Sequence, residues 1–451
     1  MSATFTDRKT PLSDFIPAML DYRFNSALGG FEHGFDRDLH MFVLWEKSAD
    51  QWQAIREDLE ARFTVLHATR ITWTPKRVDD NFLRLYGMAP TGSTADQPVS
   101  KRSQTVGGGP FMLLVVEDPA PVYFYDRTFS KKVELVNGNV AQAKARYRAM
   151  TGGGFKIHSS NSLGEFFRDC TLLLGAETVH ALLARREAWR GEALPLSTDL
   201  AGAAGWPSLQ ALFEHLRRTC LYAVLRNFEP LPGQLPDGDA DLDLLCRDAA
   251  DLAAVANARI VVAAGGKFAC ETDVAGRALH LDLRVVGDGY YDDRWQLRML
   301  QASQAHGGCV TVLSPDDHFF SLLYHAKVHK RSVSESYRRR LPILAAELGL
   351  YAYREADFAD DKVAAGLLAG FLVSRDYRCT TPLDVWVNCN GAFMERLNGE
   401  GLIWERERER DTRRVAAVLA RAPVLWRFRR RLSTPVAMAY RAMKKRAWRS
   451  A

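Results

Sequence analysis

The residues of this 451-residue chain whose types and spacing best suit chemistry are two aspartates, Asp241 and Asp243. Alternate residues of an extended strand share a face, so the two carboxylates would lie side by side, with Leu242 and Leu244 on the apolar face. Neighbouring carboxylates repel each other unless a cation lies between them. Because neither His nor Cys accompanies the pair, the pattern favours Mg²⁺ or Mn²⁺ over Zn²⁺.

A third carboxylate, Asp282, lies in a second segment with alternating apolar residues, 279–284. An unpaired carboxylate within a strand is costly, which suggests that Asp282 joins the first two acids on a neighbouring strand. Three acids on two strands suit metal-assisted transfer of a phosphoryl or nucleotidyl group. The alternative is that Asp241 and Asp243 line the solvated face of an edge strand.

Residues 222–245, YAVLRNFEPLPGQLPDGDADLDLL, resemble the core of the nucleotidyltransferase superfamily. That family has a Gly-Ser turn after its first strand, then an Asp-x-Asp strand, then a third Asp on a later strand. The resemblance implies that Asp241, Asp243 and Asp282 bind the metal and carry catalysis. Arg226-Asn227 replaces the Gly-Ser turn, and the Arg226 guanidinium would bind phosphate there in its place.

The same pattern is similar to divergent bacterial members associated with surface-polysaccharide assembly and to the LicD-like branch, which moves phosphorylated groups onto glycans. The resemblance therefore implies a nucleoside triphosphate or nucleotide-activated donor and a glycan or lipid-linked glycan acceptor. Downstream, Lys327 lies between His325 and His329 in an expected helix, without the glutamate of an HExxH zinc motif. Lys327 and Lys330 would either face phosphate or acidic glycan, or belong to a solvated helix face.

A histidine, His158, ends a short apolar strand and is followed by Ser and Asn capping residues and a helix. A helix N-terminus favours anions. Residues 155–165, FKIHSSNSLGE, resemble nucleoside diphosphate kinase, in which the phosphate-accepting His lies in an I-H-G-S-D-S motif, and His158 matches that nucleophile. Arg127, and Arg146 or Arg148, are candidate phosphate ligands. The alternative is that His158 is a capped structural histidine at a strand edge.

The elements that would position these residues fall into an N-terminal group and a central group. The N-terminal group is expected to contain strands over residues 39–45, 65–73, 111–116, 122–125 and 155–158 and helices over residues 50–63, 139–150 and 163–174. The central group is expected to contain helices over residues 209–222 and 248–258 and strands over residues 259–264 and 278–286. From residue 315 the pattern is mostly helical.

We therefore predict a multidomain α+β protein. The two resemblances imply a ferredoxin-like, kinase-type α/β sandwich followed by a nucleotidyltransferase-type mixed sheet with a helical C-terminal region. The predicted parts are a lead-in (1–38), a nucleoside-diphosphate-kinase-like domain (39–175), a nucleotidyltransferase-like domain (205–315), a helical region (316–420) and a basic amphipathic tail (421–451).

The composition is that of a globular protein, with 47% hydrophobic and 25% charged residues. No stretch approaches the roughly 18 uninterrupted apolar residues of a spanning helix, and the N-terminus lacks an apolar signal segment, which favours a cytoplasmic location. The seven cysteines form no CxxC pair, so we expect reduced core thiols.

The net charge of +6 is concentrated at the C-terminus. Ten basic residues and no acid lie in 421–451, so the first 420 residues carry a net charge of −4. Within 424–449 the basic residues alternate with apolar and aromatic ones, which suits the surface of an anionic membrane. Alternatively, the aromatic residues pack onto the body. Nucleic acid is not an expected partner, because the rest of the chain has no basic-aromatic stripe.

These observations lead to three hypotheses. The first is an enzyme that transfers a phosphate-containing group during surface-glycan assembly, in the cytoplasm or peripherally at the inner membrane face. The second is a regulatory or scaffold protein whose two domains are catalytically degenerate nucleotide sensors. The third is a nucleotidyltransferase that modifies nucleic acid.

Overall fold

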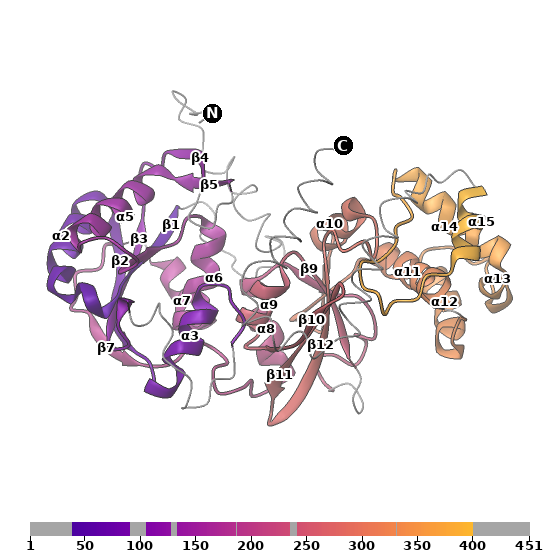
Figure 1. Cartoon of the computed structure of the whole chain (residues 1–451), viewed down its shortest axis with the longest axis horizontal. Coiled ribbons are helices and arrows are strands. Elements are labelled where there is room, and N and C mark those ends of the chain that lie inside the picture. The colour runs from indigo at the N-terminus through magenta and orange to yellow at the C-terminus, as the bar shows by residue number, and fades with distance from the viewer. Residues whose placement is uncertain are drawn as a thin grey trace, which may run out of the picture.

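The computed structural model describes residues 38–90, 105–127, 133–185, 187–234, 241–330 and 332–399. Within them the fold is mixed α and β: two large sheets lie one after the other along the long axis, followed by a region of helices (Figure 1). The multidomain α+β prediction is confirmed at this level. The predicted basic tail and nearly all of the predicted lead-in lie outside the described residues.

The N-terminal unit is built on a five-stranded sheet of order β6-β1-β3-β2-β7. Its first four strands are antiparallel to their neighbours, and β7 is parallel to β2. Its strands are β1 (Leu39–Leu44), β2 (Thr64–Thr72), β3 (Phe111–Glu117), β6 (Ile157–Ser159) and β7 (Leu194–Ser197), with a separate pair β4 (Tyr123–Arg127) and β5 (Val133–Asn137). Its helices are η1 (Glu46–Gln51), α2 (Trp52–Arg62), η2 (Pro75–Arg77), α3 (Val78–Leu85), α5 (Gly138–Met150), α6 (Leu163–Leu174) and α7 (Ala176–Ala184).

The starts of α5 and α6 are fixed by side-chain caps. The Asn137 side chain accepts from the Val140 amide at the start of α5, and the Ser162 hydroxyl accepts from the Glu165 amide at the start of α6. Such caps satisfy amides that have no partner within the helix. The α6 cap matters most for function, because it fixes the short loop between His158 and the helix.

The central unit is built on a seven-stranded sheet of order β10-β11-β12-β9-β8-β14-β13. Its strands are β8 (Tyr222–Val224), β9 (Leu242–Cys246), β10 (Arg259–Ala264), β11 (Lys267–Val274), β12 (Arg277–Val285), β13 (Gln304–His306) and β14 (Val310–Val312). Its helices are α8 (Leu209–Thr219), α9 (Ala249–Val255) and α10 (Asp293–Gln301). Strands β9 and β12 are parallel, whereas β8 and β9 are antiparallel.

After β14, the described residues form helices and loops. The helices are α11 (Pro315–Tyr324), the π-helical turn η3 (His325–His329), α12 (Glu335–Glu347), α13 (Glu355–Ala359), α14 (Asp361–Ser374) and α15 (Gly391–Gly399). Helices α10, α11 and α14 share an apolar core with one face of the second sheet. Within the described residues, no helix has the length and apolar character needed to cross a bilayer.

The two sheets share one continuous apolar core. One face of the first sheet packs on α2 and α5. The other face packs on α3 and α6, and the same cluster continues through α8 and α9 into the second sheet. Apolar burial therefore holds the two units together as well as each unit by itself.

Buried arginines cross this boundary. Arg84 of α3 donates from Nε to the Ala254 carbonyl and from Nη2 to the Ala201 carbonyl, at 2.8 and 2.6 Å. Burial, together with the neighbouring Arg168, lowers the pKa of the Arg84 guanidinium to about 9. Both arginines therefore depend on polar partners that the opposite unit supplies.

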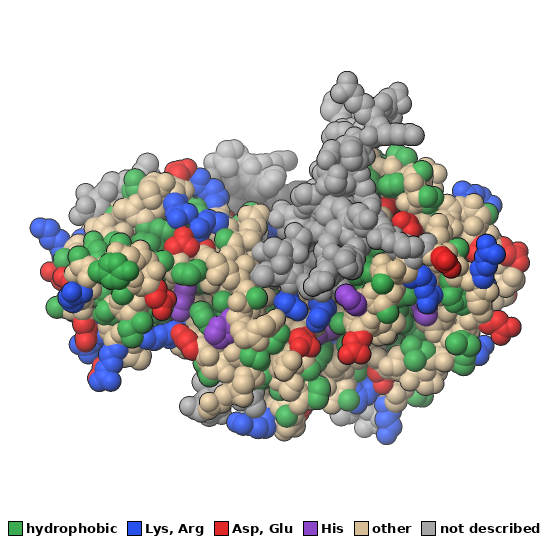
Figure 2. Space-filling view, turned by 180° about the vertical axis from the view of Figure 1, so that it is seen from behind, with side chains coloured by type: hydrophobic (Ala, Val, Ile, Leu, Met, Phe, Trp, Pro, Cys, Tyr) green, Lys and Arg blue, Asp and Glu red, His purple; other side chains and the backbone are tan. Residues whose placement is uncertain are grey.

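The surface seen from behind carries both signs of charge. Lysine and arginine side chains are interspersed with aspartate and glutamate over the N-terminal unit and the C-terminal helices (Figure 2). A basic stripe of the kind that follows a nucleic-acid backbone is not seen among the described residues of that face.

Candidate functional site

Two of the three predicted acids lie directly beside each other. Asp243 of β9 and Asp282 of β12 are paired in register across the two parallel strands, in the middle of the second sheet. Asp282 is buried and Asp243 is partly exposed. Asp241 is exposed and immediately precedes β9. The sheet therefore brings together the acids that the two alternating segments suggested.

Arginines already neutralise these two carboxylates. Arg226, just after β8, donates from Nη2 to Asp243 Oδ1 at 2.7 Å. Arg284 donates from Nη2 to Asp282 Oδ2 at 2.9 Å and from Nη1 to Asp384 Oδ2 at 2.6 Å. Two arginine side chains of the protein therefore supply the positive charge beside these carboxylates.

The electrostatics follow from burial and these pairs. Burial raises the pKa of Asp282, Arg284 opposes that rise, and the neighbouring Asp243 adds to it. Burial by itself would lower the pKa of Arg226, but Asp243 reverses this and holds it well above its ordinary value. A raised carboxyl pKa beside a second carboxylate is the condition that a divalent cation relieves.

The donor set fits a hard cation. Asp282 Oδ1 is buried and has no hydrogen-bond partner among the described residues, so it is an oxygen that an ion would satisfy. Asp243 and Asp282 would hold Mg²⁺ or Mn²⁺, with Asp241 as the exposed third carboxylate. In the described part of the chain, however, the three possible ligand atoms that lie within 4.8 Å of one another belong to His158, Glu165 and Asp169, and not to these aspartates.

The Arg226-Asn227 turn after β8 has a defined backbone conformation. Asn227 has a φ of 58°, a left-handed conformation that Asn tolerates better than most residues. Its side-chain oxygen accepts from Arg340 Nη1 at 2.8 Å. Arg226 thus lies between strand β8 and the Asn227 side chain that α12 anchors, and these two contacts hold it beside Asp243.

A cavity of about 610 Å³ adjoins this turn. Its lining includes Phe228 and Glu229 directly after the turn, His306 and His318 opposite, and Arg340. Most of the other lining residues are apolar, and Glu229 and Arg340 pair with each other across its edge, which suits a ligand with an apolar or ring-shaped part. The cavity is therefore a candidate place for part of a substrate.

The predicted Lys327 has a different environment. It is buried in η3, and its Nζ donates to the Ala359 carbonyl and to Asp361 Oδ1, at 3.1 and 2.8 Å. These contacts join η3 to α13 and α14. His325 is buried in the same turn, with its Nδ1 2.6 Å from the Tyr290 hydroxyl. The contacts of Lys327 therefore assign it to helix packing, and the structure does not bring it to the carboxylates.

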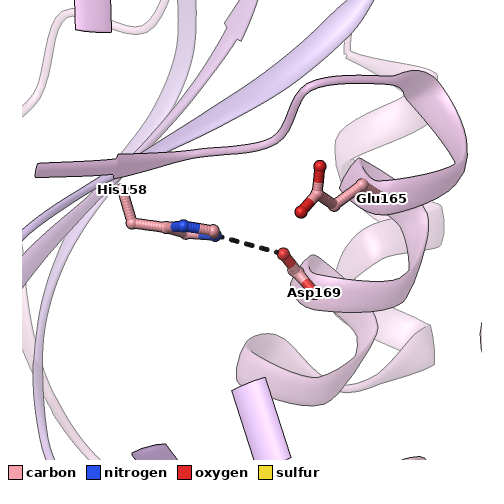
Figure 3. A group of neighbouring side chains, drawn as sticks. All are labelled: His158, Glu165 and Asp169. Carbon is pink, nitrogen blue, oxygen red and sulfur yellow. Dashed lines mark hydrogen bonds and ion pairs between the residues drawn. The ribbon is translucent and has the colours of Figure 1, made fainter. Parts of the chain in front are cut away.

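A second site surrounds His158 in the N-terminal unit. His158 Nε2 lies 3.3 Å from Asp169 Oδ2 (Figure 3). The Tyr86 ring packs against the imidazole in a tilted arrangement, at 5.0 Å between ring centroids. If the carboxylate holds the imidazole proton on Nε2, the Nδ1 lone pair is left for another group. The geometry allows His158 to act as a nucleophile as well as a ligand.

Several contacts hold the His158 strand in place. The Ser160 hydroxyl accepts from the Met41 amide at 3.1 Å, and Arg148 Nε donates to the Ile157 carbonyl at 3.1 Å. Burial lowers the pKa of Arg148, and Tyr86 opposes that fall. Of the two arginine candidates before the loop, Arg148 is thus the one beside His158, whereas Arg146 pairs with Asp58 at 3.3 Å. Arg127 ends β4, and its side chain lies outside the described residues.

Sequence reasoning missed Glu165 and Asp169. They lie four residues apart on α6, and their carboxylates face His158 (Figure 3). The spacing in the sequence was a usable signal, because residues i and i+4 of a helix share a face, and this helix begins five residues after His158.

Arg168 connects this second site to the central unit. Its guanidinium donates to Asp169 Oδ1 and, at 2.8 Å from Nε, to Asp251 of α9. Helix α9 follows the strand that carries Asp243. The two candidate sites are therefore joined by buried ion pairs and a short stretch of chain. Comparison of the sequence with models of known families and with curated proteins finds no match to either.

Proposed function

We propose that the protein is a metal-assisted transferase of nucleotidyl or phosphoryl groups, acting on a glycan or lipid-linked glycan during surface-polysaccharide assembly. The observation that carries the proposal is the pairing of Asp243 and Asp282 in register, with the Asp282 Oδ1 atom lacking a hydrogen-bond partner within the described residues. Two adjacent carboxylates beside a buried arginine suit the binding of a metal-bound phosphate.

The strand arrangement supports the two fold types behind this proposal. An antiparallel order β6-β1-β3-β2, with helices between the strands, is compatible with a ferredoxin-like, kinase-type unit. In the central unit, β8, β9 and β12 lie side by side in a mixed sheet, with the Arg226-Asn227 turn after β8 and acids on the other two strands. This is compatible with a nucleotidyltransferase-type sheet.

In this proposal the residues have separate tasks. Asp243 and Asp282 hold the divalent cation, which, when bound, orients phosphate oxygens and stabilises their charge. Arg226 stays paired with Asp243 Oδ1, its remaining N–H groups would bind a phosphate, and Asp243 Oδ2 would serve the metal. Arg284 stays with Asp384 and keeps the buried acids from repelling one another.

A second candidate function is nucleotide sensing or scaffolding without turnover. The observation that favours it is the existing pairing of Asp243 with Arg226 and of Asp282 with Arg284. A site whose acids are already neutralised can bind a nucleotide through its arginines without a metal. The two functions therefore differ in whether magnesium is required.

The first prediction tests that difference. Asp243→Asn combined with Asp282→Asn is expected to weaken magnesium-dependent binding of a labelled nucleoside triphosphate at least tenfold and to remove pyrophosphate or phosphate release, because both metal ligands lose their charge. The exposed Asp376→Asn serves as the matched control. Unchanged magnesium-dependent binding in the double variant would refute the transferase proposal. If the wild-type protein binds the nucleotide equally well with and without magnesium and releases no phosphate or pyrophosphate, nucleotide sensing is favoured.

The second prediction concerns His158. If its Nδ1 attacks the γ-phosphorus of a triphosphate, a P–N bond forms, the bond to the nucleoside diphosphate breaks, and the diphosphate leaves. Incubation with γ-labelled triphosphate should then leave acid-labile, base-stable label on the protein. His158→Ala should abolish the label, and His180→Ala, at an exposed position of α7, should keep it. Label that persists in His158→Ala would return His158 to a structural role.

A further inference from the structure

We propose that His158, Glu165 and Asp169 form a binding site for a divalent transition-metal ion, with Zn²⁺ as its best match, separate from the carboxylate site of the proposed transferase. Each residue offers one ligand atom, and these atoms all lie within 4.8 Å of one another (Figure 3). The imidazole comes from β6 and the two carboxylates from one face of α6. A strand and a capped helix therefore hold the ligands from two sides.

The distances suit a metal. His158 Nε2 and Asp169 Oδ2 are 3.3 Å apart. Two ligands that each lie about 2.1 Å from a zinc ion, at a tetrahedral angle, are separated by about 3.4 Å. The ion would thus take the place of the proton between the two atoms, with little movement of either side chain. The imidazole proton then lies on Nδ1, so phosphate transfer to Nδ1 would belong to the zinc-free protein.

Outer contacts already orient both carboxylates. Arg168 donates to Asp169 Oδ1, which leaves Oδ2 directed at His158. The Asn161 amide donates to Glu165 Oε2 at 2.7 Å, which leaves Oε1 for a ligand. Groups that bind the far oxygen of a ligating carboxylate fix its direction and raise metal affinity.

The ligand types select the metal. One imidazole with two carboxylates suits Zn²⁺, whereas Mg²⁺ prefers oxygen ligands and retains its water. His158 and Asp169 are buried and Glu165 is partly exposed, so solvent reaches the site from the Glu165 side. Three protein ligands leave a fourth position on that side for water or a phosphate oxygen.

Zinc binding can be measured without nucleotide. The full-length protein, stripped with a chelator and dialysed, is titrated with Zn²⁺ against a chromogenic zinc indicator. We expect one tight equivalent, at least tenfold weaker in His158→Ala and in Glu165→Gln. Glu165→Gln keeps the helix-start contacts, because Gln can also accept from the Asn161 amide. A thermal melt checks that each variant is folded.

Three controls make the result specific. Cys389→Ser removes the thiol that is not fully buried, His180→Ala removes an exposed histidine, and Asp243→Asn removes a ligand of the other site; all three should bind Zn²⁺ like the wild type. Wild-type zinc affinity in a folded Glu165→Gln variant, or no tight equivalent in the wild type, would overturn the proposal. Because nucleotide is absent, neither result depends on whether the protein is a transferase.

Discussion

Lowering the pH from 7 to 5 is expected to destabilise the folded protein by about 4 kcal/mol, because several buried histidines must stay neutral in the native state. Burial, together with Arg84, Arg168 and Arg218, lowers the pKa of His215 to about 3. Burial and Arg340 lower the pKa of His318 to about 4. His325 and His329 are shifted in the same direction, first by burial and then by Arg226.

The sign follows from proton uptake. In the unfolded chain each histidine binds a proton near pH 6.5, whereas the folded protein resists protonation down to about pH 3 at His215 and about pH 4 at His318. The unfolded state therefore binds more protons in this window, and stability present above pH 6.5 is lost as the pH falls. His215 and His318 each contribute about 2 kcal/mol between pH 7 and pH 5.

Urea unfolding at pH 7, 6 and 5 measures this effect as the slope of unfolding free energy against pH. The slope gives the number of protons taken up on unfolding. His215→Leu should reduce that number by about one, whereas His180→Leu, at an exposed position, should leave it unchanged. His318→Leu provides a second test if His215→Leu does not fold. A stability that stays constant from pH 7 to pH 5 would contradict the buried neutral histidines.

Local patterns were enough to predict much of the fold. The predicted helix over 163–174 coincides with α6, since its capping Ser and its apolar spacing both lie within a few residues. The alternating acids likewise predicted two strands, because a period of two is visible in the sequence itself. The pairing of Asp243 with Asp282 then follows only once β9 and β12 are known to be neighbours.

Other features depended on contacts between distant segments. The predicted strand near 122–125 exists as β4, but it pairs with β5, not with β3 before it. The first sheet also extends beyond the expected end at residue 175, because β7 pairs with β2. Strand β11 was not predicted although the turn signal Gly265-Gly266 directly precedes it, since its run mixes polar and apolar residues without regular alternation.

At the carboxylate site, too, local sequence patterns predict the near partner of an arginine but not the distant one. Arg284 could have been inferred as a partner of Asp282, because residues i and i+2 share a strand face. Asp384, by contrast, lies one hundred residues further on, in a loop whose position nothing local determines. Lys327 was expected at a phosphate because of its charge, but its position in a turn packed by α13 and α14 decides its role.

Replacing Arg168 with Met is expected to destabilise the protein by about 3–5 kcal/mol, the cost of leaving one partner of a buried ion pair without its counterion. Arg168 is almost fully buried, and it also donates to the Leu85 carbonyl at 2.9 Å and the Arg84 carbonyl at 2.8 Å. Its loss leaves Asp169 charged and buried, and removes Asp251's partner across the two units. Urea unfolding at pH 7 measures the change.

Arg56→Met is the control at a more exposed pair: Arg56 of α2 pairs with Glu60, donates to the Gly191 carbonyl and lies over the Trp189 ring, and its loss should cost clearly less than that of Arg168. Adding Asp169→Asn to Arg168→Met should recover part of the loss, because the buried charge then disappears with its partner. Equal small effects of Arg168→Met and Arg56→Met would show that the ion pairs across the boundary contribute little. A large loss that Asp169→Asn relieves would instead show that the buried carboxylate of the His158 site depends on Arg168, the same side chain that pairs with Asp251 of the central unit.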